Sequence, residues 1–448
     1  MELSWQPIFS VDDITQQQWG QLSNHNAQFS SPFLSYQYLK GLESSACVNG
    51  KTGWHSYHIG IFSDHNEENN EEYNELIAFI PCYLKTHSYG EYIFDHAWAN
   101  AYQHHQIPYY PKLVACIPFT PVTGSRILIK TDCEYSFEEI NRFIVESTDL
   151  ILSEARASSL HILFLPEYQS RLLIADPQIV DSPIENKSIS DKPTEIKLLQ
   201  RLSVQFVWQN RDYASFDEFM QQMTSRKRRS IRKERANAVK GVIAASLPVR
   251  SDAMPIGAFA NEAVANEAVA KNIDVKRLVG EQITPEVMAD FYLCYQQTYL
   301  KRSGHKGYLT EAFFEFLRTE MQTNIMIVIA YAEGHCIAAA LFFYNEEQLY
   351  GRYWGALHEV SGLHFECCYY QGIEFAIEKK LRQFNPGTQG EHKILRGFEP
   401  TFCYSNHYLQ HPDFQKAVAD FLHNERVGIE QYKQQGDSVL PFKRQDGK

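Results

Sequence analysis

A long apolar run in the second half of the chain is interrupted at its centre by polar residues. The run reads IMIVIAYAEGHCIAAALFFYN, and residues 333–335 form the interruption. Polar residues and glycine between two apolar runs are typical of a hairpin turn between strands. We therefore expect strands at residues 325–332 and 336–344, with a third strand at 348–354.

A helical pattern follows the third expected strand. In the segment LHFECCYYQGIEFAIEKKL, the residues Phe365, Tyr369, Ile373 and Ala376 recur at steps of three and four, which places them on one face of a helix. Gly372 in this helix would let it approach its sheet closely. The turn signal NPG comes next, and we expect QGEHKILRGF beyond it to form a strand that returns beside the helix.

The order of these elements predicts the fold class. Helices expected at residues 286–300 and 311–320 precede the three strands, the crossover helix and the returning strand, which together make an α/β layer packing. The first half has strand patterns at residues 55–63 and 76–85 and a similar order. Acyltransferases of the GNAT superfamily share this order. We therefore expect the α/β (α+β) class, with a mixed, mostly antiparallel sheet flanked by helices in each half, an order that other α/β folds share as well.

Polar and low-complexity segments indicate the domain limits. IENKSISDKPT, at residues 184–194, has the composition of a linker. We expect an N-terminal domain at residues 1–195 and a C-terminal domain at residues 196–448. The stretch at residues 64–75 is predicted to be an acidic loop, and the segment 251–272, which contains NEAVA twice, a helical insertion.

Composition limits the function. The 448 residues carry a formal net charge of -12, which argues against DNA binding or a general nucleic-acid coat, because polyanion binding needs excess lysine and arginine. Nine cysteines without CxxC spacing indicate free thiols in a reducing compartment. The start of the sequence lacks the pattern of a signal peptide. We expect a cytoplasmic protein without a transmembrane segment, whose membrane contact, if it has one, is peripheral.

Several segments together carry a family resemblance. SSPFLSYQYLKGLE, YLKTHSYGEYIFDHAWANAY, SRKRRSIRKERANAV, GRYWG and QGEHKILRGFEP resemble the FemAB-like family of bacterial proteins. This family is described as peptidoglycan biosynthesis or recognition proteins and is assigned to the GNAT superfamily. The resemblance covers nearly the whole chain. It implies tandem GNAT-like (FemAB-type) domains and transfer of an acyl or aminoacyl group to an amine, for which a small molecule and a cell-wall precursor are both candidate acceptors.

Acyl transfer to an amine needs a base, a polarised carbonyl and groups that stabilise the charge of the intermediate. Glu391 and His392 on the expected returning strand, and His364 at the start of the crossover helix, are the candidate bases. The helix dipole would lower the basicity of Glu366 in the first turn, which favours Glu391 or His364. Tyr404 is the candidate acid for the leaving group. The candidate substrate-binding and charge-stabilising residues nearby in the sequence are Arg352, Tyr353, Glu366, Lys393 and Arg396.

The donor remains open between two classes. The connection GRYWGALHEVSGLHFE lacks the compact RxxGxG/A spacing of a CoA pyrophosphate loop. Acyl-CoA and aminoacyl-tRNA therefore both stay as candidate donors, and no tightly bound cofactor is expected.

His364 and Cys368 lie four apart on one helix, but no second pair has metal-ligand spacing, so no metal site is predicted.

A basic segment and a polar–aromatic segment supply further binding candidates. Residues 225–240 hold eight basic residues and one acidic residue in a helical pattern. They are either a solvated helix face or a phosphate clamp, in which Arg228 and Arg232 would bind a nucleotide-linked substrate, a tRNA acceptor stem or anionic lipid. In the first half, Asp95 and His96 are candidate substrate-binding residues. The alternative function is a non-catalytic GNAT-like protein that recognises a phosphate-bearing peptidoglycan or nucleotide-linked ligand.

Overall fold

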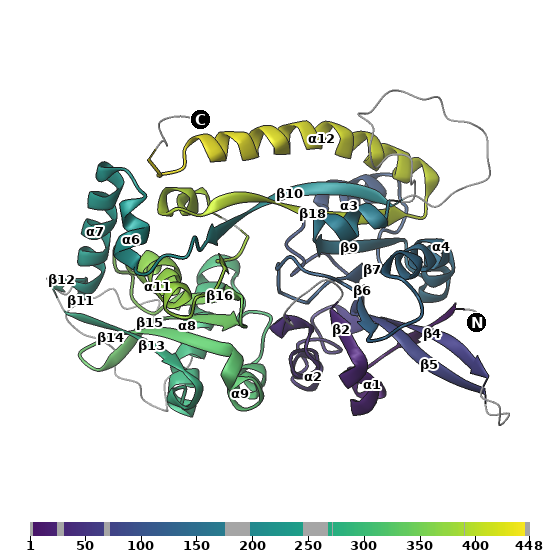
Figure 1. Ribbon diagram of the computed structural model, residues 1–448, viewed down its shortest axis with the longest axis horizontal. Helices are drawn as coiled ribbons and strands as arrows, with labels where there is room; N and C mark the ends of the chain where they lie inside the picture. The colour runs from purple at the N-terminus through teal and green to yellow at the C-terminus, as the bar shows by residue number, and fades with distance from the viewer. Residues whose placement is uncertain are drawn as a thin grey trace. The chain divides into compact units, whose positions relative to one another are not determined.

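A computed structural model describes the chain over most of its length (Figure 1). The described residues are 3–24, 31–66, 72–174, 198–244, 268–270, 272–388 and 390–443. The chain divides into two units, here called the N-unit (residues 1–205 and 401–434) and the C-unit (residues 206–400 and 435–448). The expected linker at 184–194 lies outside the described residues. Three elements cross from one unit to the other: β10 (Leu199–Gln209), β18 (Glu399–Leu409) and α12 (Pro412–Ser438).

The N-unit contains strands of two sheets. The first sheet has the order β1 (Leu3–Ile8), β4 (His58–Asn66), β5 (Glu72–Ile80), β8 (Leu128–Lys130), β2 (Leu22–Asn24), and all of its pairs are antiparallel. The second runs β18, β9 (Ser159–Leu165), β7 (Lys112–Ala115), β6 (Cys82–Lys85), β3 (Trp54–Ser56), with β7 and β9 parallel. Its helices are α1 (Gln16–Gln21), α2 (Tyr36–Ser44), α3 (His96–His104), α4 (Phe137–Ala155) and α5 (Glu167–Leu172).

Each of the two strands expected in the first half is divided between the sheets. The segment expected at 76–85 forms β5 in one sheet and β6 in the other, with Pro81 between them. Proline has no N–H to donate to a ladder, so the strand breaks there. The acidic stretch is also shorter as a loop than expected, because β4 continues to Asn66 and β5 begins at Glu72.

The C-unit sheet confirms the expected meander. Its order is β13 (Ile273–Val279), β14 (Ile325–Ala332), β15 (His335–Tyr344), β16 (Gln348–Ala356), β17 (Gln383–Asn385), β10. The first four strands pair antiparallel, and β16 and β17 pair parallel. The helices are α6 (Phe216–Gln221), α7 (Ser225–Val239), α8 (Pro285–Ser303), α9 (Glu311–Glu320), α10 (Leu363–Phe365) and α11 (Gln371–Glu378). The predicted hairpin, the helices at α8 and α9 and the basic helix at α7 are all present.

The predicted returning strand is wrong in its position. The strand that returns beside β16 is β17, whereas Glu391–Arg396 forms a 3₁₀ helix, η7. Gly390 and Gly397 bracket η7 with φ angles of 111° and 88°. These values lie in the region that favours glycine, and an extended strand does not pass through them. The ionisable residues of this segment therefore lie on a helical turn and not on a sheet.

Two smaller expectations can also be compared with the structure. A Cβ added to Gly372 would lie 2.6 Å from the Phe384 ring on β17, so the close approach of helix to sheet is confirmed. The helical insertion is wrong at Ala268–Ala270, which pairs as strand β12 with β11 (Val242–Ala244). Residues 251–267 of that segment lie outside the described residues.

Taken together, the mixed, mostly antiparallel sheets flanked by helices confirm the predicted fold class. No helix in the described part of the chain combines the length and apolar character needed to cross a membrane.

Candidate functional site

One turn of π-helix interrupts the crossover between β16 and β17. It spans Glu366–Tyr370, between α10 and α11. Single π turns inside helices occur frequently at functional sites. Here aromatic side chains from this turn and from the two residues before it gather around one residue of η7. The ring of His392 has its centroid 5.4 Å from that of Phe365, 5.7 Å from Tyr369 and 6.0 Å from His364.

The two histidines of this group are uncharged near neutral pH. Burial lowers the pKa of His364 to about 3, and the neighbouring His392 and Arg302 lower it further. Burial and the charge of Arg396 also lower the pKa of His392. The Nε2 atom of His392 lies 2.8 Å from the hydroxyl of Tyr369. A neutral imidazole in this position can accept a proton, which a charged one cannot.

Lys393 is a buried amine next to this histidine. Its Nζ donates a hydrogen bond to the Gly387 carbonyl at 2.7 Å, and the residue is 2% exposed. Burial lowers its pKa to about 7, and the positive charge of Arg352 contributes to the same effect. Within the described ranges no carboxylate lies at salt-bridge distance from Lys393. The side chain therefore exchanges between a charged and a neutral form near neutral pH.

Arg396 joins η7 to the basic helix α7. Its Nη2 lies 2.5 Å from Oε1 of Glu234 and its Nη1 donates to the His392 carbonyl at 2.7 Å. The guanidinium also covers the Phe365 ring at 3.4 Å from the centroid. Glu234 accepts a further hydrogen bond from the Tyr370 hydroxyl. Arg396 thus holds the backbone of η7 in place, which positions His392.

Glu366 is engaged with α7 in the same way. Arg235 donates to both of its carboxylate oxygens, at 2.9 and 2.8 Å, and Gln371 donates to Oε1 at 2.7 Å. Arg235 also reaches Glu374 at 2.5 Å. Because both oxygens are occupied, Glu366 serves to dock the π turn on α7. Sequence reasoning missed Glu234 and Arg235 as partners, although Glu234 stands out as the one acidic residue of the basic segment.

Three other predicted residues of the C-unit lie in different surroundings. Tyr353 is buried in the core, edge-on to Tyr295 at 5.6 Å and to Phe314 at 6.0 Å. Arg352 precedes it on β16, and its charge acts on Lys393. Glu391 is exposed in the first turn of η7.

The basic helix α7 divides its charges between two faces. Arg228 is half-buried and donates to the Met223 carbonyl at 2.6 Å. Arg232 is exposed, with Asp217 at 3.9 Å. The exposed side also presents a hollow of about 320 Å³, lined by Ser225, Arg226, Arg229, Ser230 and Lys233. The outward face of α7 therefore matches the solvated or phosphate-binding alternatives, whereas its inward face is structural.

The remaining predicted residues belong to the N-unit. Asp95 is buried and accepts hydrogen bonds from Lys112 and, at 2.7 Å, from Tyr109. His96 is exposed and stacks on Phe94. Tyr404 lies on β18, where burial raises its pKa to about 12. None of the three belongs to the unit that carries the His392 group.

A cavity of about 380 Å³ adjoins His364 where β16 leads into the crossover. The wall includes Trp354, whose ring lies 5.4 Å from that of His364, and the basic residues Lys301 and Arg302 from the end of α8. Lys301 pairs with Glu359 at 3.3 Å. The cavity lies at the connection GRYWGALHEVSGLHFE, which lacks the compact spacing of a CoA pyrophosphate loop. Arg302 was missed there because nothing in its local sequence relates α8 to this connection.

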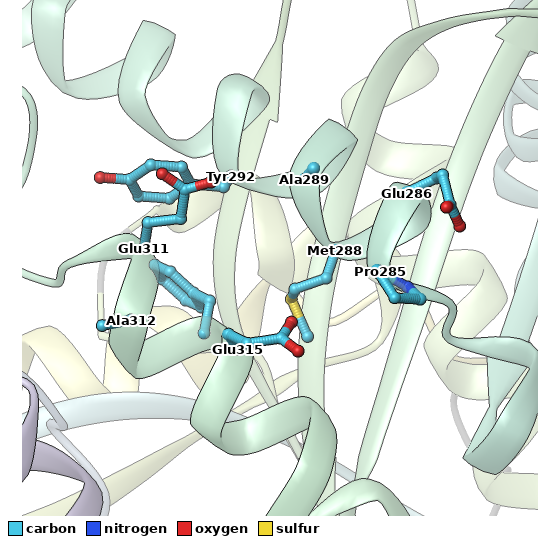
Figure 2. Close-up of a pocket in the computed structure, with 9 residues that line it drawn as sticks. Pro285, Glu286, Met288, Ala289, Tyr292, Glu311, Ala312 and Glu315 are labelled. Carbon is cyan, nitrogen blue, oxygen red and sulfur yellow. The ribbon is translucent and has the colours of Figure 1, made fainter.

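A second C-unit cavity has the opposite charge. It measures about 390 Å³ and lies between α8 and α9, whose side chains form its wall in Figure 2. Glu286, Glu311 and Glu315 line it together with Met288 and Tyr292, and no described lining residue is basic. A phosphate-bearing substrate therefore fits the cavity at His364 better than this one.

No group of three metal-ligating side chains that could hold a metal ion occurs in the ranges the structure describes. The cysteines Cys367 and Cys368 of the π turn are free, and burial raises the pKa of both thiols. A raised pKa leaves little thiolate to act as a nucleophile. Neither thiol of the π turn therefore has the character of a nucleophilic cysteine.

The chain matches one family model over almost its full length. The model is FemAB-like, described as peptidoglycan biosynthesis/recognition, and it matches residues 10–249 and 264–444. A comparison with curated proteins found no match.

A comparison with solved structures found matches of low sequence identity to this chain. A crystal structure of FemX has 9% identity and a TM-score of 0.45, and the match covers 94% of this chain and 100% of FemX. L-PGS from Bacillus licheniformis has 10% identity and a TM-score of 0.39, with 77% of this chain and 86% of that chain covered. A tandem GNAT protein from the clavulanic acid biosynthesis pathway has 10% identity and a TM-score of 0.37, with 92% and 99% covered.

Proposed function

The chain belongs to the FemAB-like family, and from that premise we propose that it transfers an acyl or aminoacyl group to an amine of a cell-wall precursor. The family's description supports the class of acceptor. The observation that carries the chemistry is the neutral His392 hydrogen-bonded to Tyr369, with Lys393 as the next residue. These are the groups that an amide-forming reaction requires.

In the proposed reaction the acceptor nitrogen attacks the donor carbonyl carbon, and a C–N bond forms. The carbonyl oxygen gains negative charge, which the protonated form of Lys393 would stabilise. The nitrogen then loses a proton to His392. The bond from the carbonyl carbon to the donor's sulfur or ribose oxygen breaks, and the departing atom takes up a proton. Burial raises the pKa of Tyr369 far above its usual value, so its hydroxyl remains protonated and can donate.

The proposed reaction selects His392 among the predicted bases. His364 has a pKa of about 3, too low for an effective base at neutral pH. Glu391 is exposed on η7 and Glu366 is occupied by Arg235. In the tautomer of His392 whose Nε2–H donates to the Tyr369 hydroxyl oxygen, the lone pair of Nδ1 is free to take the proton, so we assign the base role to His392.

The cavity at His364 is the proposed site for a phosphate of the substrate. Arg302 supplies positive charge, whereas Lys301 is paired with Glu359 of the same wall, and Trp354 supplies a flat surface. Acyl-CoA and aminoacyl-tRNA both carry phosphates, so this feature fits either donor, and the exposed charges of α7 favour the larger tRNA.

The second candidate function is recognition without transfer. It is supported by the connection between β16 and α10, which lacks the compact spacing of a CoA loop. It is also supported by the ion pairs that tie Glu366 and Arg396 to α7, because these charges serve the fold.

One experiment separates the two functions. Purified full-length protein is titrated calorimetrically with acetyl-CoA and with charged tRNA, and each donor is then incubated with an amine-bearing muropeptide precursor while amide formation is followed by mass spectrometry. Donor binding with amide product supports the transferase. Muropeptide binding without product from either donor would contradict it and support the recognition protein.

A further inference from the structure

We propose that a cavity of about 620 Å³ in the N-unit is a binding site for a small aromatic anion. The cavity lies where the segment before β7, the end of α4 and the start of α12 meet. All of its lining residues belong to the N-unit, so it is separate from the His392 group. Its volume lies in the range of sites for small organic ligands.

Flat, rigid side chains make up five of the thirteen residues that line the cavity. Tyr102 and Tyr110 contribute aromatic rings, and Pro108, Pro111 and Pro412 contribute proline rings. Tyr102 is itself stacked on Phe414 at 3.8 Å between centroids, which fixes the plane of its ring. A planar aromatic ligand gains from offset stacking on such surfaces. The shape of the wall therefore selects a ring system and not a flexible chain.

The charge of the wall selects an anion. Arg156 and His411 line the cavity, and none of the lining residues, all of which are described, is acidic. This is unusual in a chain whose net charge is -12. A guanidinium binds carboxylate, sulfonate or phosphate through paired hydrogen bonds.

Arg156 is also held in a backbone conformation that arginine rarely adopts. It closes α4 in the left-handed region, with φ 50° and ψ 40°. This backbone conformation costs free energy, which contacts with the surrounding structure must offset. Residues strained in this way concentrate at ligand sites. The Nδ1 atom of His411 adds a second feature, because it is buried and has no hydrogen-bond partner among the described residues. A ligand acceptor or donor in the cavity would satisfy it.

Hydrogen bonds to residues outside the cavity support two of its lining residues, Tyr110 and Ser158. The hydroxyl of Tyr110 lies 2.8 Å from Ser88 Oγ, which also accepts from Lys112 at 2.9 Å. At the other side of the cavity, Ser158 contacts Ser159 at 3.3 Å, and Ser159 lies 2.9 Å from Nε2 of His161. These bonds fix the wall before a ligand arrives, and preorganisation of this kind lowers the cost of binding.

The test uses 1-anilinonaphthalene-8-sulfonate, an aromatic sulfonate whose fluorescence rises in apolar surroundings, with the full-length protein. We expect saturable binding at one site that Arg156→Gln weakens by about tenfold or more, since a hydrogen-bonded charge is lost. Arg142→Gln is the matched control, because Arg142 is an exposed arginine on the same helix and does not line the cavity. Equal affinity in the wild type and Arg156→Gln would overturn the proposal.

A second pair of variants tests the location. Ser153 lines the cavity from the last turn of α4 and is exposed. Ser153→Trp should fill the cavity and abolish binding, whereas Ser153→Ala should retain it. Unchanged binding in Ser153→Trp would place the probe elsewhere and refute the site.

Competition identifies the class of anion. N-acetyltryptophan, adenosine monophosphate and inorganic phosphate are each titrated against the bound probe. Displacement by an aromatic carboxylate or an aromatic phosphate, but not by inorganic phosphate, supports a ring-selective site. Displacement by inorganic phosphate alone would refute the aromatic part of the proposal. None of these measurements depends on acyl transfer, so their outcome is independent of the proposed function.

Discussion

The hydroxyl of Tyr369, on the π turn, lies 2.8 Å from Nε2 of His392, on η7. The two residues are 23 positions apart in sequence, and the packing of the π turn near η7 brings them together. Arg396 holds the helical form of η7 by donating to the His392 carbonyl. This pair is the centre of the proposed transfer reaction.

Removing the base should lower turnover much more than binding. For His392→Gln we expect amide formation to fall by about 10²-fold or more, because general-base catalysis contributes at least that factor. Tyr369→Phe should cause a smaller loss and change the pH profile of the reaction. Single-turnover rates at saturating substrate measure both effects.

His335→Gln is the matched control, since His335 begins β15 and takes no part in the group. A His392→Gln rate equal to that of His335→Gln would rule out His392 as the base.

Lys393 should make the stability of the protein depend on pH. Its pKa is about 7 in the folded protein and near 10.5 when unfolded. Between these values the unfolded chain binds more protons, so the contribution of this residue to the free energy of unfolding rises with pH, by about 1.4 kcal/mol per pH unit. Below pH 7 the full penalty for burying the charge is present.

Lys393→Met removes that penalty. We expect the variant to be more stable than the wild type at pH 7, with a difference that shrinks as the pH approaches 10.5. Urea unfolding at several pH values measures it. A difference that is constant over this range would show that Lys393 is charged in the folded protein.

The docking of α7 should depend on the buried carboxylate of Glu366. Glu366→Ala leaves Arg235 facing a buried site without its bidentate partner. We expect the free energy of unfolding to fall by about 3 kcal/mol, as is typical when one member of a buried ion pair is removed.

A double-mutant cycle with Arg235→Met, followed by chemical denaturation, isolates the pair. Because Arg235 also contacts Glu374, the single Arg235 variant carries a second loss that the cycle subtracts. Additive effects of the two substitutions would mean that the pair has no net coupling.

The exposed face of α7 should bind polyanions in a salt-dependent way. Replacing Arg226, Arg229 and Lys233 by glutamine should weaken tRNA binding and make the slope of log affinity against log salt shallower by about 2–3, if each contacts a phosphate. Fluorescence anisotropy over a series of salt concentrations measures the slope.

Glutamine at Lys51, Arg142 and Arg171 removes the same charge from exposed positions of the N-unit and is the control. An identical slope in the two triple variants would show that α7 acts only through the overall charge, and would leave the solvated-face interpretation.

Much of the fold could be predicted from local pattern alone. The hairpin of β14 and β15, the helices α8 and α9 and the close approach at Gly372 follow from apolar periodicity and from a glycine between helix and sheet. Such features depend on residues within about ten positions of one another, and periodicity records them.

The conformation of η7 was not predictable from its composition. Its place after the crossover helix and the NPG turn suggested a strand, but Gly390 and Gly397 adopt positive φ angles that turn the chain at both ends. Glycine permits these angles without requiring them, so only the packed structure decides whether they occur.

The sequence by itself determined the class of fold, the family and most of the residues that carry charge near the crossover. The tertiary structure decided their roles. It paired Glu366 and Arg396 with α7, left His392 neutral beside Tyr369, buried Lys393 without a carboxylate partner among the described residues, and brought Arg302 to the cavity at His364. The physical reason is that pKa values and ion pairs depend on burial and on neighbours distant in sequence, and no local pattern specifies these.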